Sequence, residues 1–114
     1  MKQAFEFQEQ ENLVVVKVRN LLSEFIMRDM LDEASKHMKQ GNYNYVVDLS
    51  EIDYMNSVGL NFLLILKSRA ALMAGKVSFA NPSEKVLQLL EMTKLTDILN
   101  PAHSLEAAIA QVEQ

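Results

Sequence analysis

The residues of this chain that could carry chemistry are few, and they do not group into a catalytic set. The sequence has no cysteine, and its two histidines, His37 and His103, stand far apart. Disulfides, thiol catalysis and thiolate metal sites are therefore excluded. A metal site needs three or four converging ligands, so we interpret His37 as a solvated helix residue and His103 as a loop residue. With three glycines, the chain also cannot build a glycine-rich phosphate loop. We expect no enzyme activity, no metal and no cofactor.

Three carboxylates, Asp48, Glu51 and Asp53, follow one another closely at the end of an apolar segment. The end of a strand is where an open α/β sheet often places a site. No nucleophile and base accompany these carboxylates as a set. We therefore interpret Glu51 and Asp53 as solvated loop residues.

One serine remains as a candidate. Ser57 lies in the run Asn56-Ser57-Val58-Gly59, where a polar connection ends and an apolar helix is expected to begin. At or beside the N-cap, its oxygen can accept a hydrogen bond from an N–H of the first turn. Gly59 is about 1 kcal/mol less favourable in a helix than alanine, so close packing or contact with a partner must explain it. The local sequence leaves open whether this run is only a helix cap and a packing glycine.

Composition and charge place the chain among soluble globular proteins. Hydrophobic residues make up 49% and charged residues 23%, and the net charge is −4. No cluster of lysine and arginine marks a surface for nucleic acid or an anionic membrane. The densest apolar run, from Phe62 to Leu66, is too short to span a bilayer, and the N-terminus resembles no signal peptide. We expect a single cytoplasmic domain over residues 1–114 that contacts neither nucleic acid nor membrane directly.

The apolar pattern predicts strands that alternate with helices. The expected strands are 4–8, 13–18, 43–49 and 76–80, with a short edge strand at 97–99. The expected helices follow Ser23, span about 58–74, follow Ser83 and follow Ser104. This order predicts an α/β fold with a mostly parallel mixed sheet of four to five strands, about four helices and an antiparallel first strand.

The helix expected at 58–74 is apolar on most of its surface. A helix that is apolar all round is usually buried, but a small domain has little room to bury every face. Two explanations remain. Either a neighbouring helix covers it, or the face near Asn61 and Phe62 is exposed for a partner.

Two segments at a fixed spacing resemble the STAS family, to which anti-sigma factor antagonists belong. Residues 54–60, Tyr-Met-Asn-Ser-Val-Gly-Leu, are similar to the family signature of an aromatic or apolar pair followed by Asp-Ser-(Ser/Thr/Ala)-Gly-Leu. Residues 78–84 and 89–95 resemble the family's later strand, its Asn-x-Ser-Glu turn and a leucine-rich helix that ends in Thr-Gly-Leu. The order of elements is similar over nearly the whole chain.

The resemblance implies the STAS fold and a regulatory role. An anti-sigma factor antagonist binds an anti-sigma factor, which is a serine kinase of the histidine-kinase-like ATPase type. The kinase phosphorylates the serine after the signature aspartate, here Ser57, and thereby prevents binding. A serine phosphatase is the second implied partner. The implied partner-binding residues are Asn56, Ser57, Val58, Gly59, Asn61 and Phe62.

The chain departs from the family pattern at two acidic positions. Asn56 stands where the family has aspartate, and Ser23 ends the stretch that often carries a second acid. The loss of both carboxylates favours a second hypothesis, a STAS scaffold or a transporter's regulatory subunit without a phosphorylation cycle. Asn56 has two opposite implications for phosphorylation. It removes a like charge beside the phosphate, yet it leaves the serine less well positioned for the kinase.

Overall fold

The sheet has four strands in the order β1-β2-β3-β4 in a computed structural model that describes residues 3–113. The strands are β1 (Phe5–Glu9), β2 (Val14–Val18), β3 (Tyr45–Asp48) and β4 (Val77–Ala80). β1 runs antiparallel to β2, whereas β2, β3 and β4 are parallel. The antiparallel first strand and the parallel remainder confirm the predicted α/β class.

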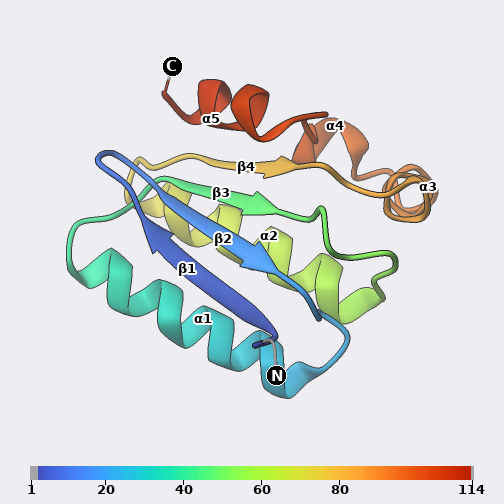
Figure 1. Cartoon of the computed structure of the whole chain (residues 1–114), viewed down its shortest axis with the longest axis horizontal. Coiled ribbons are helices and arrows are strands. Elements are labelled where there is room, and N and C mark those ends of the chain that lie inside the picture. The colour runs from blue at the N-terminus through green and yellow to red at the C-terminus, as the bar shows by residue number, and fades with distance from the viewer. Residues whose placement is uncertain (1–2, 114) are drawn as a thin grey trace.

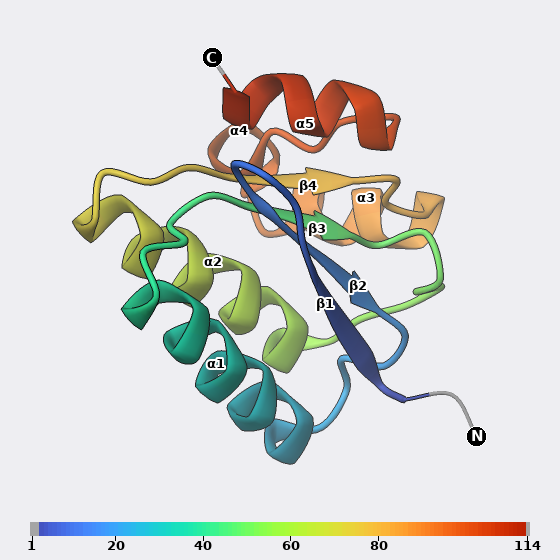
Figure 2. The same ribbon diagram turned by 60° about the vertical axis from the view of Figure 1, so that its left-hand side comes forward.

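Five helices are present among the described residues. They are α1 (Glu24–Lys39), α2 (Ser57–Leu72), α3 (Glu84–Met92), α4 (Thr96–Leu99) and α5 (Leu105–Glu113). Both views of the chain show α1 and α2 on one face of the sheet and α5 on the other (Figures 1 and 2). The sheet therefore lies between two helical layers, which explains why its central strands are buried on both faces.

The alternation of side chains along β2 divides the core between these layers. Val14 and Val16 belong to the larger apolar cluster with α1 and α2, whereas Val15 packs in the smaller cluster with Ala108 and Val112 of α5. A strand that is covered on both faces reads as a continuous apolar run rather than an alternating one. The run of valines in the sequence thus follows from the two-sided packing.

The edge strand predicted at residues 97–99 is wrong, because these residues form the helical turn α4. Its backbone bonds are helical, with Asn100 N–H donating to the Thr96 carbonyl at 2.7 Å. The sheet edge is extended slightly later, where Ala102 forms a single parallel bridge with Ala80. A segment of only three residues gives no period by which helix and strand can be distinguished.

The prediction that His37 is a solvated residue is also wrong. Its side chain is only 12% exposed, and its ring stacks on Phe7 of β1 at a centroid distance of 5.2 Å. Nδ1 lies 2.7 Å from a carboxylate oxygen of Glu9, and Nε2 lies 3.3 Å from one of Glu33. The hairpin end of β1 thus packs onto α1, a tertiary contact that the helix pattern does not contain.

Tyr45 is the largest side chain in the centre of the sheet that also carries a polar atom. It is fully buried, and its hydroxyl donates to the Asn42 carbonyl at 2.6 Å. Burial raises the pKa of the Tyr45 hydroxyl well above its usual value, with a smaller contribution in the same direction from the Glu9 carboxylate. The folded protein therefore favours the neutral phenol.

We expect Tyr45 to make the fold sensitive to high pH. An unfolded tyrosine loses its proton near pH 10, whereas the folded Tyr45 retains it, so its contribution to stability is intact below about pH 10. Above that pH the free energy of unfolding should fall by up to about 1.4 kcal/mol per pH unit. Urea unfolding of wild type and Tyr45→Phe between pH 8 and about pH 11 measures this. An equal fall in the free energy of unfolding of wild type and Tyr45→Phe would show that Tyr45 is not the group responsible.

Candidate functional site

The first turn of α2 is capped by Asn56, and Ser57 is left free. Asn56 is the N-cap, and its side-chain oxygen accepts a hydrogen bond from Val58 N–H at 3.0 Å. Its NH2 group donates to the Leu22 carbonyl at 3.3 Å. Ser57, predicted at or beside the cap, is the first helical residue and is exposed. Its hydroxyl makes no hydrogen bond within residues 3–113, so the capping bond that we expected of Ser57 belongs to Asn56.

The amide of Asn56 joins two loops that meet beside Ser57. One loop follows β2 and the other follows β3, so both emerge from the carboxyl ends of parallel strands. An aspartate at this position could accept the capping bond, but it could not donate to Leu22. The asparagine therefore replaces a negative charge with a second tether between the loops.

The loop after β2 is held on both sides of the apolar pair Leu21-Leu22. Before it, the Arg19 guanidinium lies 3.2 Å from a carboxylate oxygen of Glu51 in the loop after β3. After it, Ser23 caps α1 by accepting hydrogen bonds from Phe25 N–H at 3.1 Å and from Ile26 N–H at 3.5 Å. Ser23, which replaces an expected acid, thus has a structural role.

The loop after β3 is fastened at Asp48 and Asp53. Asp48 is buried and accepts a hydrogen bond from Ser50 N–H at 3.0 Å. The Asp53 carbonyl accepts one from the Ser83 hydroxyl at 2.7 Å, and its carboxylate lies 3.2 Å from the Lys85 ammonium group. Asp53 is thus exposed and also paired with Lys85, whereas the buried Asp48 stabilises the start of the loop through its bond to Ser50.

Gly59 is a packing glycine. It is buried, and a Cβ atom at this position would lie 2.9 Å from Met55 Cβ and 3.3 Å from the Leu21 carbonyl oxygen. Contacts this short force neighbouring atoms to move. Of the two reasons proposed for this glycine, close packing is the one that the geometry explains.

Three further residues of the predicted partner surface differ in their exposure. Asn61 is exposed, Val58 is half-buried and Phe62 is completely buried. Phe62 therefore packs in the core and cannot contact a partner directly, so its assignment to the partner surface is corrected. Burial of most of α2 against the sheet and α1 accounts for its apolar sequence without an exposed face near Phe62.

Exposed apolar side chains instead lie on the loops beside Ser57. Leu22 is 47% exposed, Tyr54 is 55% exposed, and Phe25 in the first turn of α1 is 74% exposed. Leu22 and Tyr54 line a shallow hollow of about 310 Å³ between the two loops. Two features of the sequence indicate this surface. Tyr54 is part of the signature, and Leu22 and Phe25 are apolar residues that precede and follow Ser23.

A family model supports the resemblance that the sequence motifs and the order of elements indicated. The STAS domain model matches residues 4–108. The chain belongs to the STAS domain family. The run Asn56-Ser57-Val58-Gly59 lies within the matched residues and forms the N-cap and first turn of α2.

Solved structures share this fold at low sequence identity. TM1081 of Thermotoga maritima, a candidate anti-sigma factor antagonist, has 17% identity and a TM-score of 0.85, over 96% of this chain and 95% of that one. The anti-sigma factor antagonist SpoIIAA of Bacillus, in its unphosphorylated form, has 20% identity and a TM-score of 0.81, over 96% of both chains. Its phosphorylated form aligns with a TM-score of 0.74. These likenesses show the fold.

A transporter also contains a similar unit. The murine anion transporter Slc26a9 aligns with 93% of this chain at 14% identity and a TM-score of 0.74, and the match covers 18% of the transporter. A comparison with curated protein sequences gave no significant match. Among residues 3–113 no helix is both long enough and apolar enough to cross a membrane.

Proposed function

We propose that this chain is an anti-sigma factor antagonist, which binds an anti-sigma factor and so frees a sigma factor. The observation that carries the proposal is the exposed Ser57 in the first turn of α2, beside exposed apolar side chains on two loops. A partner that buries Leu22, Phe25 and Tyr54 removes apolar surface from water, which favours association. The membership in the STAS family and the likeness to SpoIIAA support this role.

The proposed partner surface consists of the Ser57 end of α2 and the adjacent loops. It includes Asn56, Ser57, the half-buried Val58 and Asn61 from the predicted set. Leu22, Phe25 and Tyr54 are added, and the buried Gly59 and Phe62 are removed. A standard interface buries about 1,200–2,000 Å² in total, which is more than one helix end supplies. Contacts therefore extend over both loops.

The partner that fits a free serine hydroxyl is a serine kinase of the histidine-kinase-like ATPase type. In this proposal the kinase phosphorylates Ser57, and a serine phosphatase restores the binding form. In this proposal the chain itself acts by binding rather than by catalysis. Val58 carries no hydroxyl, so Ser57 has no adjacent competitor as acceptor.

A second candidate function is that of a regulatory module bound to a transporter, without phosphorylation. The alignment with Slc26a9 favours it, as do Asn56 and Ser23 in place of acids. Both residues have structural roles here, in caps and in a tether between loops. Because Asn56 and Ser23 have structural roles, they do not decide between the two functions, and the identity of the bound protein must do so.

Affinity purification from the native organism tests the proposed function. Wild-type protein and Ser57→Asp serve as baits, and bound proteins are identified by mass spectrometry. We expect wild type to retain a protein with a histidine-kinase-like ATPase domain. In a purified mixture, the wild-type chain should displace a sigma factor from that protein. Retention of a transporter by both baits would instead establish the second candidate.

A further inference from the structure

A second candidate site lies at the end of α2 that is remote from Ser57. A cavity of about 360 Å³ lies between the last two turns of α2, the start of β4 and the segment from α4 to α5. This volume is within the range of about 300–1,000 Å³ that is usual for small-molecule sites. The cavity lies at the amino end of the parallel strands, whereas Ser57 follows their carboxyl end.

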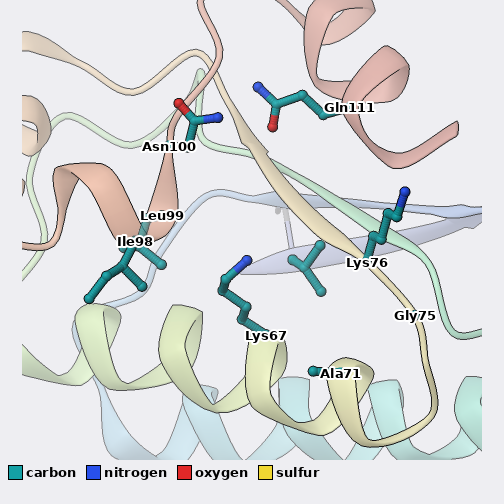
Figure 3. A pocket seen from close by; sticks show the side chains of 9 residues that line it. Lys67, Ala71, Gly75, Lys76, Ile98, Leu99, Asn100 and Gln111 are labelled. Carbon is teal, nitrogen blue, oxygen red and sulfur yellow. The ribbon is translucent and has the colours of Figure 1, made fainter. Parts of the chain in front are cut away.

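The charge of the cavity is opposite to that of the whole protein. Among residues 3–113, Lys67 and Lys76 are the charged residues that line it, and no carboxylate side chain does, although the net charge of the chain is −4. Figure 3 shows the Lys67 ammonium group directed into the cavity and that of Lys76 directed away from Lys67. Lys67 is therefore the group that can pair with a ligand.

Two amide side chains share this space with Lys67. The side chains of Asn100 at the end of α4 and Gln111 of α5 extend into the cavity from the side opposite α2 (Figure 3). Within the part of the chain that the structure describes, neither amide and no atom of the Lys67 ammonium group has a hydrogen-bond or ion-pair partner. An amide presents NH2 or oxygen by a half-turn, so three donor groups can converge on one acceptor.

The remaining wall is apolar. Val77 and Leu99 are buried beneath the cavity, and Ile98 at its rim is 55% exposed. A ligand that fits has an anionic head at Lys67 and a short apolar body against these side chains. One unpaired ammonium group matches one negative charge, which favours a carboxylate over a phosphate dianion.

The ends of neighbouring helices oppose an anion here, but weakly. α2 and α5 both direct their C-terminal ends toward this side of the sheet (Figure 2), and each helix end carries about half of one negative charge. The Ala70 and Ala71 carbonyls at the end of α2 already accept hydrogen bonds from residues 73–75. Lys67 carries a full positive charge inside the cavity and therefore dominates.

We propose that this cavity binds a small aliphatic monocarboxylate, with Lys67 as the counter-ion and Asn100 and Gln111 as hydrogen-bond donors. The site is separate from the Ser57 surface and does not depend on the proposed function. Because the cavity is open to solvent, we expect weak binding, with a dissociation constant on the order of 1 mM for a five-carbon acid.

Titration followed by amide chemical shifts tests the site. The probes are 3-methylbutanoate, its uncharged amide 3-methylbutanamide and inorganic phosphate. We expect saturable shifts with 3-methylbutanoate, confined to residues 67–77 and 98–111, and at least about tenfold weaker binding of the other two. Lys67→Met, which keeps the apolar stem, should weaken binding about tenfold or more, and Lys67→Gln provides a second loss of charge.

Lys39→Met is the matched control, because it removes the same charge from an exposed position at the end of α1. It should change the dissociation constant by less than about twofold. The proposal would be overturned by chemical shifts that do not saturate or that spread outside the two segments. It would also be overturned if Lys67→Met and Lys67→Gln, both folded, bound 3-methylbutanoate as tightly as wild type. Binding of phosphate without binding of 3-methylbutanoate would overturn the ligand class.

Discussion

Phosphorylation of Ser57 is expected to weaken binding of the anti-sigma factor by about a hundredfold, or ~2.7 kcal/mol. The phosphate adds about −1.5 to −2 charges at neutral pH, at a position beside the exposed Leu22 and Tyr54. A partner that covers these apolar side chains must exclude water from the phosphate as well. An unpaired charge in such an interface costs several kcal/mol, so docking should be lost.

The same phosphate should leave the domain folded. Ser57 is the first residue of α2 and its side chain is exposed. The free N–H groups of the first turn and the positive end of the helix dipole favour a negative charge there. Asn56 satisfies the Val58 N–H without adding a like charge. We therefore expect the melting temperature to change by only a few degrees, since about 1 kcal/mol shifts it by roughly 4–8 °C in a domain of this size.

Incubation with the kinase partner and ATP, followed by mass spectrometry, locates the phosphate. Calorimetry then compares wild type, Ser57→Ala and Ser57→Asp, and we expect only the aspartate variant to lose affinity. Ser68→Asp is the matched control, because Ser68 is an exposed serine on the same helix and lies far from the proposed surface. An unmodified Ser57 together with tight binding by Ser57→Asp would show that no phosphorylation switch exists here.

The helices and strands that could be predicted are those in which the periodic pattern of apolar residues extends over many residues. In α1, the buried residues Met30, Leu31, Ala34 and Met38 recur at the spacing of one helix face, which made this helix predictable. The turn at 97–99 was misassigned as a strand because a period needs more residues than this segment has. Gly41, Gly75 and Pro82 located the ends of α1, α2 and β4 to within a few residues.

The details of the candidate site depend on contacts between distant segments, which periodicity does not report. Asn56 is the cap, and its amide also donates to the Leu22 carbonyl, 34 residues earlier in the chain. Phe62 was assigned to a surface by the family resemblance. Because α2 is apolar on most of its surface, only the packing of α1 and the sheet shows which side is covered. His37 likewise packs against Phe7 and Glu9 of β1.

Replacement of Gly59 by arginine is expected to destabilise the domain by about 3 kcal/mol or more. The reason is the close packing around Gly59. A Cβ atom there meets Met55 Cβ at 2.9 Å, and the rest of the side chain must pass Met55 and the Leu21 carbonyl. The better helix propensity of arginine returns only about 1 kcal/mol. The melting temperature should therefore fall by roughly 10 °C or more.

Urea unfolding of three variants distinguishes packing from charge. Ser68→Arg adds the same charged side chain at an exposed position of α2 and should change the free energy of unfolding by less than about 0.5 kcal/mol. Gly59→Ala should fall between the two, because it adds only the Cβ atom that Met55 must yield to. The fall in its free energy of unfolding is reduced by the gain of about 1 kcal/mol in helix propensity. A Gly59→Arg protein as stable as Ser68→Arg would mean that Met55 yields freely and that contact with a partner is the reason for this glycine.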